Sequence, residues 1–231
     1  MASIFKIIVN YKHYLILGTK VTVVVSLLAS LLGLVCGVLM ALMKKCKIRP
    51  LRWIANFYVE VVRGTPVLVQ ISMVYYGLPM IGVSFPNMEI GGVTFDRLFA
   101  GILALAINST AYICEIVRGG IESVDSGQKE AAQALGFSNT NIMKLIILPQ
   151  ALRNVLPTLG NEFVSMVKQS SQVSIMGLAD LMYAADIIRG NTYRPFMPLV
   201  IVAVIYLVLT ISLSYIFKGI ERLTCKGRKA I

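Results

Sequence analysis

The stretch that decides the fold is YLILGTKVTVVVSLLASLLGLVCGVLMALM, residues 14–43, in which Lys20 is the one charged side chain. A helix needs about 20 apolar residues to cross the hydrocarbon core of a bilayer, and this run is longer than that. It is also too long for a signal peptide, and the basic pair Lys44-Lys45 follows it where a cleavage site would need small residues. We therefore expect a permanent membrane helix near the N-terminus.

The composition extends this conclusion to the whole chain. Of 231 residues, 57% are hydrophobic and 14% are charged, against about 45–50% and about 25% in soluble domains. This balance excludes a disordered chain, a soluble nucleic-acid-binding protein and a secreted disulfide scaffold. Backbone groups in lipid must pair within their own segment, so the spans are helices. We expect one all-α membrane domain over residues 1–231 with five transmembrane helices, at about 14–43, 53–81, 98–117, 156–178 and 195–217.

The distribution of lysine and arginine predicts the orientation. The net charge is +11, from 22 Lys and Arg against 11 Asp and Glu. Fourteen basic residues fall after spans one, three and five, and five fall on the other side. Cytoplasmic segments carry the basic excess in membrane proteins, so we expect the N-terminus outside and the C-terminus in the cytoplasm. The same rule explains the positive charge without a nucleic-acid partner.

Two short segments are expected on the outer side. In the first, Gly91 and Gly92 separate Met88–Ile90 from Val93–Phe95, a pattern that predicts a tight β-hairpin. In the second, residues 180–194, we expect only a loop.

Span two contains signals for a break. Gly64 and Pro66 interrupt its helical pattern, and a proline in a helix causes a kink or an end. Glu60 and Arg63 lie three residues apart just before this point, and the ordinary interpretation is that they form an ion pair with each other.

The segment between spans three and four, residues 118–153, is too polar to insert and too patterned to be a simple connector. Asp125, with a glutamine three residues later, resembles a capping box, and Gly136 fits the position after a helix C-terminus. Ser138 could cap a second short helix that stops at Leu148-Pro149. We expect a helix–glycine–helix unit that either docks into a partner protein or lies on the lipid headgroups.

This segment resembles a known motif. Glu130-Ala131-Ala132, then Gly136 and Leu148-Pro149, match in spacing the EAA loop of the membrane subunits of ABC importers. Further stretches are similar to the permeases for uptake of polar amino acids: Arg63-Gly64-Thr65-Pro66, Tyr75-Tyr76-Gly77-Leu78-Pro79, Asn108-Ser109-Thr110-Ala111-Tyr112 and Leu159-Gly160-Asn161-Glu162-Phe163.

The resemblance implies a subunit of an amino-acid importer in a bacterial cell membrane. Two such subunits, identical or homologous, would form the pore, and an external solute-binding protein would deliver a polar amino acid. A cytoplasmic ATPase dimer would grip the EAA loop, in which the coupling residues would be Glu130, Ala131, Ala132, Leu135, Gly136, Leu148 and Pro149. The chain has no P-loop, so we expect no enzymatic activity and no cofactor in it, with ATP and Mg²⁺ bound by the ATPase. The cysteines form no CxxC pair, and no metal site is expected.

Polar side chains inside the spans are costly and mark functional sites by default. In span three, Asn108, Tyr112 and Glu115 share one side of a helix, with Ser109 beside them. These residues could contact substrate, or they could only bond one helix to another.

Span four is interrupted by Glu162 and by five consecutive polar residues, 168–172. On a helix Glu162 shares a face with Gln169, and Lys168 shares another with Gln172. Such residues line a wet cavity or a subunit interface, or they form a structural seam. An amino acid needs an anion for its ammonium group and a cation for its carboxylate, which Glu162 and Lys168 could supply.

The candidate substrate-binding residues are Asn108, Ser109, Tyr112, Glu162, Lys168 and Gln169. Members of the family that take arginine tend to have an acidic residue where this chain has Gln169. The resemblance therefore favours a neutral or acidic amino acid, such as glutamine, glutamate or cystine, over a basic one.

Two other functions remain open at this point. One is a secondary transporter driven by protons through Glu115 and Glu162, against which five spans are few. The other is a membrane scaffold that recruits a soluble partner, which would not explain the polar residues of span four.

Overall fold

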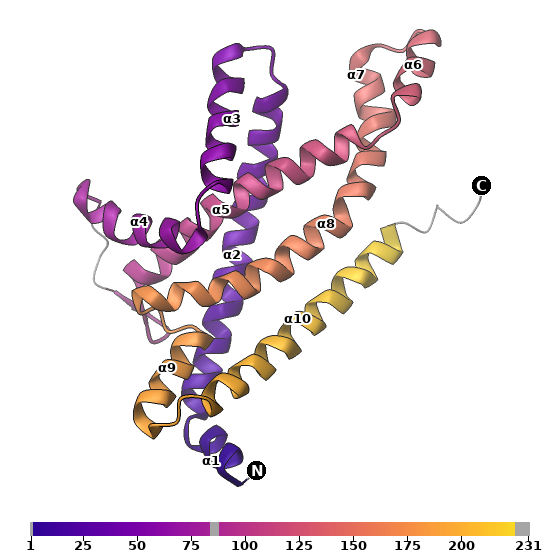
Figure 1. Ribbon diagram of the computed structural model, residues 1–231. Coiled ribbons are helices and arrows are strands. Elements are labelled where there is room, and N and C mark those ends of the chain that lie inside the picture. The colour runs from indigo at the N-terminus through magenta and orange to yellow at the C-terminus, as the bar shows by residue number, and fades with distance from the viewer. Residues whose placement is uncertain (1, 84–87, 225–231) are drawn as a thin grey trace.

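The structure, a computed structural model, describes residues 2–83 and 88–224 and is a set of long tilted helices with one small hairpin (Figure 1). The basic tail positions Lys226, Arg228 and Lys229 lie outside the described residues. In chain order the elements are α1 (Ala2–Asn10), α2 (Lys12–Lys45), α3 (Arg49–Arg63), α4 (Val67–Met80), β1 (Glu89–Ile90), β2 (Val93–Thr94), α5 (Phe95–Glu122), α6 (Ser126–Ala134), α7 (Asn139–Asn141), η1 (Ile142–Ile147), α8 (Leu148–Gln169), η2 (Ser170–Met176), α9 (Leu181–Thr192) and α10 (Met197–Thr224).

Helix α5 is the centre of the fold, and α2, α3, α4 and α8 all pack against it. Helices α2 and α5 approach closely because Gly33 and Gly37 of α2 face α5. A Cβ atom at Gly33 would lie 2.7 Å from the Cβ of Ser109, and one at Gly37 would lie 2.8 Å from the Cβ of Ile113. Two glycines four residues apart allow this approach, as in other membrane helix pairs.

The predicted apolar spans are present as helices. Among the described residues, α2, α5 and α10 are each long and apolar enough to cross a membrane, and α3 with α4 passes the same test as a bent pair. Helix α8 is not in this group, because Asn154, Asn161 and Lys168 lower its hydropathy. An all-helical membrane fold is therefore confirmed, whereas the count of five spans stays a prediction.

The break predicted in span two is confirmed. Helices α3 and α4 meet at an angle of 108°, with Gly64 at the end of α3 and Pro66 as the N-cap of α4. The side-chain amide of Gln70 on α4 reaches back and donates hydrogen bonds to the carbonyl oxygens of Val62, at 2.7 Å, and Thr65, at 3.1 Å. These bonds satisfy carbonyl groups that the helix end leaves open.

The predicted hairpin is also confirmed. Strands β1 and β2 pair antiparallel, with Glu89 opposite Thr94 and Ile90 opposite Val93. Gly91 and Gly92 have φ angles of 61° and 84°, the positive values that the favoured two-residue hairpin turns require.

The expectation of a mere loop at 180–194 is wrong, because residues 181–192 form helix α9. The Asp180 carboxylate caps this helix by accepting hydrogen bonds from the backbone N–H groups of Met182 and Tyr183. The start of α9 also packs closely on α2, where a Cβ atom at Gly18 would lie 2.7 Å from the Asp180 carbonyl oxygen.

The predicted end of a helix at Leu148-Pro149 is wrong as well. A π-helical turn, η1, leads directly into α8, so the chain stays helical from Asn139 to Gln169. Pro149 stands in the first turn of α8, directly after the π-helical turn η1. The connecting segment between α5 and α8 is consequently shorter than the expected 118–153.

Candidate functional site

A cavity of about 410 Å³ lies among helices α2, α5, α8 and α10. Its walls are mostly leucine, isoleucine and phenylalanine, interrupted by Ser30, Ser109 and Glu162. Ser30 Oγ, Ser109 Oγ and Glu162 Oε1 are buried and have no hydrogen-bond partner among the described residues. Buried polar atoms are nearly always bonded in proteins, so these three are available to a ligand or to water.

The cavity can hold a small polar molecule. Its volume lies within the range of about 300–1,000 Å³ that is common for small-molecule sites, which are mostly apolar with a few placed polar groups. Glu162 has no cationic side chain bonded to it in the described part of the chain. Its carboxylate is therefore a natural partner for an ammonium group that enters from outside.

Ser109 and Glu162 are thus the two predicted site residues that the structure brings together. Ser30 is a third member of the cavity that the sequence reasoning missed. It lies on the same face of α2 as Gly33 and Gly37, and a serine on that small-residue face was the signal that could have found it.

Asn108 and Tyr112 lie elsewhere. Asn108 Nδ2 donates a 3.0 Å hydrogen bond to Gln70 Oε1 of α4, which is the helix-bonding role considered for it. The Arg63 guanidinium lies over the Tyr112 ring, 5.6 Å from its centroid. Neither residue lines the cavity that contains Glu162.

Lys168 and Gln169 follow one another on α8 but differ in surroundings. Lys168 is exposed and does not line the cavity. Gln169 is half-buried, and its Oε1 atom is buried without a partner among the described residues. Lys168 and Glu162 therefore do not face one another across the cavity.

Glu115 is the centre of a cluster of charged side chains in the C-terminal part of α5, the part that leads to α6. Its carboxylate oxygens lie 2.6 Å from Lys44 Nζ, 2.8 Å from Arg118 Nη2 and 3.5 Å from Arg63 Nη1. The expected pair of Glu60 with Arg63 is therefore wrong, because α3 packs against α5 and Arg63 pairs there with Glu115. The cluster ties α2, α3 and α5 together.

Helix α6, which holds three of the residues predicted to contact an ATPase, has well-defined ends. Asp125 Oδ1 accepts a 2.7 Å hydrogen bond from the Gly127 N–H group at the start of α6, which confirms Asp125 as the cap. Among the described residues, no bond from the Gln128 side chain completes the capping box. At the other end, Gly136 has a φ angle of +81°. The N–H groups of Gly136 and Phe137 donate to the carbonyl oxygens of Gln133 and Ala132 at 2.9 and 3.1 Å, the Schellman arrangement.

The predicted coupling residues divide into two groups. Ala132 is buried, and α6 packs on η1, whose buried residue is Ile142. Ala132 thus holds α6 on its own chain instead of facing a partner. Its predicted companions Glu130, Ala131, Leu135, Leu148 and Pro149 are exposed. Leu135 is 77% exposed, so its side chain is accessible.

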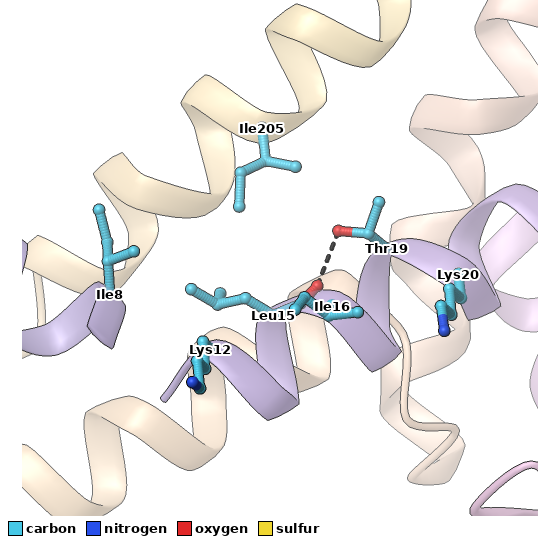
Figure 2. Close-up of a pocket in the computed structure, with 7 residues that line it drawn as sticks. All are labelled: Ile8, Lys12, Leu15, Ile16, Thr19, Lys20 and Ile205. Carbon is cyan, nitrogen blue, oxygen red and sulfur yellow. Dashed lines mark hydrogen bonds between the residues drawn. The ribbon is translucent and has the colours of Figure 1, made fainter. Parts of the chain in front are cut away.

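A second hollow, of about 400 Å³, lies between α1, the start of α2 and α10 (Figure 2). Its lining is apolar, with Lys12 and Lys20 as its charged residues. The Thr19 hydroxyl already donates to the Leu15 carbonyl oxygen at 2.7 Å (Figure 2). The hollow offers no carboxylate for an ammonium group and contains none of the predicted site residues.

No metal centre is indicated: within residues 2–83 and 88–224, no group of three His, Cys, Asp or Glu side chains is placed to hold an ion.

The sequence is similar to one family of transport proteins and to individual permeases. Residues 33–224 match the family of binding-protein-dependent transport system inner membrane components. The chain is 44% identical to the putative glutamine transport system permease protein GlnP of Rickettsia prowazekii, over 90% of this chain and 92% of that protein. It is 39% identical to the arginine transport system permease protein ArtQ of Bacillus subtilis, over 90% and 91%.

Solved structures agree with these similarities. A chain in the crystal structure of an amino acid ABC transporter with histidines superimposes with a TM-score of 0.85 at 44% identity, over 93% of this chain and 96% of that one. The MetNI methionine ABC transporter in inward-facing conformations superimposes with a TM-score of 0.70 at 20% identity, over 91% and 96%. This second match shows a shared fold alone.

Proposed function

The chain belongs to the family of binding-protein-dependent transport system inner membrane components, and from this premise we propose how its structure serves transport. It is the permease subunit of an ABC importer for polar amino acids. The subunit is not an enzyme, and ATP hydrolysis belongs to a separate ATPase. It is a multi-pass protein of a bacterial membrane whose family works with ATPases and binding proteins.

In our proposal, residues 1–231 form a single membrane domain with five spans, the N-terminus outside and the C-terminus in the cytoplasm. The spans are α2, the bent pair α3–α4, α5, α8 with η2, and α10. The excess of lysine and arginine on the side of α6 supports this orientation. Helix α8 crosses the bilayer although its hydropathy is low, because its polar residues face protein or water.

The observation that carries the proposal for transport is the membrane-depth cavity in which Ser30, Ser109 and Glu162 have unpartnered polar atoms. We assign the ammonium group of the substrate to Glu162 and a polar contact to Ser109. Asn108 and Tyr112 do not line the cavity and act on the site by fixing the helices around it. Lys168 and Gln169 of α8 take part at the entrance, where Lys168 attracts the substrate carboxylate.

The substrate is a polar amino acid, and we favour a neutral or acidic one. Permeases named for glutamine and for arginine are both among the similar proteins. Gln169 carries no charge that could neutralise a guanidinium, which supports glutamine, glutamate or cystine over arginine.

Two permease subunits would enclose the pore, and an ATPase dimer would grip both α6 segments. Closure of the ATPases on ATP draws the two segments together and turns the spans outward, so that the external binding protein can release substrate. Hydrolysis then resets the pore toward the cytoplasm. The exposed Ala131, Leu135 and Glu130 support this contact.

Uptake of radiolabelled glutamine into proteoliposomes tests the proposal. Uptake that requires the ATPase, the binding protein and internal ATP is expected. Uptake by this chain alone, driven by a proton gradient, would instead establish a secondary transporter. No uptake under any condition, with the ATPase bound to the chain, would favour a scaffold.

A further inference from the structure

The hollow between α1, the start of α2 and α10 (Figure 2) shares no lining residue with the cavity assigned to substrate. It rests on a packed core: Leu15 of α2 is buried in one cluster with Ile7 of α1 and Ile201 of α10. Its volume is about 400 Å³. We define the α1–α2 hollow by six of its lining residues, Ile8, Lys12, Leu15, Ile16, Lys20 and Ile205.

The walls of the α1–α2 hollow are apolar. Ile8 of α1 is 40% exposed and Ile16 of α2 is 55% exposed, so apolar surface remains open after the helices have packed. The Thr19 hydroxyl, which also lines the hollow, donates to the Leu15 carbonyl oxygen at 2.7 Å (Figure 2) and needs no further partner. Exposed aliphatic side chains on a membrane helix suit contact with acyl chains.

Two lysines flank this apolar surface. Figure 2 shows Lys12 and Lys20 at opposite ends of the hollow, and both side chains are exposed. No hydrogen bond or ion pair joins either ammonium group to another residue that the structure describes, and no carboxylate lines the hollow. Around Lys20, the exposed neighbours on the same face of α2 are Ile16 and Val24. A charge in such surroundings is costly unless an opposite charge or water meets it.

Aromatic side chains at the junction of α1 and α2 mark the level of the lipid headgroups. The Tyr14 ring lies 6.3 Å from that of Tyr11 and 6.0 Å from that of His13, between centroids, and tyrosine is typical of membrane interfaces. Lys12 stands among these rings. Lys20 lies about 12 Å farther along α2, but helical side chains lean toward the N-terminus, and a lysine stem extends its ammonium group toward the interface. Both ammonium groups can therefore reach the headgroup level.

We propose that the α1–α2 hollow is a binding site for one anionic phospholipid, whose acyl chain fills the hollow and whose phosphate group is held by Lys12 and Lys20. A phospholipid supplies the apolar surface and the negative charge that this site lacks. A zwitterionic lipid suits the site less, because the two lysines repel its cationic headgroup. An apolar helix of another subunit would cover the hollow but would leave both lysines unpaired.

The test is fluorescence quenching by lipids with brominated acyl chains, with the full chain reconstituted in lipid vesicles. Trp53, the one tryptophan of the sequence, is replaced by phenylalanine. Ile16→Trp then reports from the hollow. Leu28→Trp, on the exposed face about 18 Å farther along α2, is the matched control for ordinary lipid contact. Brominated phosphatidylglycerol, which is anionic, is compared with phosphatidylcholine that carries the same chains.

The preference for phosphatidylglycerol over phosphatidylcholine should be at least about fivefold greater at Ile16→Trp than at Leu28→Trp, the effect of about one lysine near an anionic lipid. Addition of Lys12→Gln and Lys20→Gln together should reduce it to the value at Leu28→Trp. Lys6→Gln, at an exposed lysine of α1 that does not line the hollow, should leave it unchanged.

Three results would overturn the inference. An equal preference at both tryptophans would show ordinary lipid contact, and an equal loss with Lys6→Gln would show a diffuse surface charge. Absence of quenching at Ile16→Trp by either lipid would show that protein covers the hollow. If Ile16→Trp does not fold, Ile8→Trp repeats the measurement from the other side of the hollow. None of these results depends on which amino acid is transported.

Discussion

The side-chain amide of Asn108 on α5 donates a 3.0 Å hydrogen bond to Gln70 Oε1 on α4. Gln70 extends this link, since its own amide donates to the carbonyl oxygens of Val62 and Thr65 at the end of α3. The bend between α3 and α4 is thus held by a residue of the central helix. Asn108 is a positioning residue for the bent span.

Replacement of Asn108 by leucine is predicted to destabilise the permease by about 1–3 kcal/mol, because Gln70 Oε1 would be left buried without a donor. The measurement is the thermal unfolding temperature of the purified subunit in nanodiscs. Addition of Gln70→Leu should cost less than the sum of the two single changes, as expected for directly bonded partners. Strictly additive effects would contradict the bond.

The features of the fold that the sequence predicts correctly are those with local causes. The apolar run of α2, the hairpin at Gly91 and Gly92, and the break at Pro66 each follow from side chains within a few residues. Helix α9 has a local cap at Asp180, but its place on α2 depends on a distant contact, since Gly18 of α2 admits its N-terminus. The partner of Arg63 was mispredicted for a similar reason: α3 packs against α5, and this contact brings Arg63 to Glu115, far away in sequence.

Glu115→Gln is predicted to destabilise the subunit by up to about 3 kcal/mol, since Lys44, Arg63 and Arg118 would lose the carboxylate that they share. Thermal unfolding in nanodiscs measures the change. The matched control is Glu122→Gln, which removes an exposed partner of Arg118 and should cost less than about 1 kcal/mol. Equal effects of the two changes would show that the cluster stabilises the subunit no more than an exposed ion pair does.

Glu162→Gln is predicted to weaken substrate binding by roughly 10- to 100-fold, because a charged hydrogen bond contributes about 1.5–3 kcal/mol. The shape of the side chain is kept, so the thermal unfolding temperature should change little. The concentration of amino acid that half-saturates transport is the readout. Asp186→Asn, at an exposed pair with Arg189, is the control and should leave that concentration unchanged. A normal value for Glu162→Gln would remove Glu162 from the site.

Gly136→Ala is predicted to uncouple ATP hydrolysis from transport. Gly136 has a φ angle of +81°, a conformation that costs a residue with a Cβ atom about 1–2 kcal/mol, so alanine would distort the end of α6. Gly136→Asn should retain most of the coupling, since asparagine tolerates this conformation. Transport and ATPase rates are measured together. Equal coupling in both variants and the parent would contradict a role for the α6 end.

Glu130→Gln tests the contact surface instead of the helix end. Glu130 is exposed, so its loss should leave membrane insertion and stability intact while it weakens ATPase binding. Co-purification of the ATPase at rising salt concentrations is the measurement. Unchanged retention of the ATPase would place the contact elsewhere on the segment.

The candidate site was harder to predict than the fold. Sequence periodicity places Asn108 and Ser109 next to each other, but the packing of α5 sends one to Gln70 and the other to the cavity with Glu162. Ser30 gave only a weak signal, because a serine among small residues is ordinary in membrane helices. The face of α8 that packs on the other helices of this chain is set by tertiary contacts, and the sequence of α8 alone does not specify it.

ATPase activity of the importer in nanodiscs, measured with its binding protein across a panel of amino acids, tests the central claim most directly. We predict that one or a few polar amino acids, glutamine or an acidic relative among them, stimulate hydrolysis. Stimulation should be lost in Gly136→Ala. Failure of every amino acid to stimulate an ATPase that is bound to the chain would contradict the assignment of this permease to polar amino-acid import.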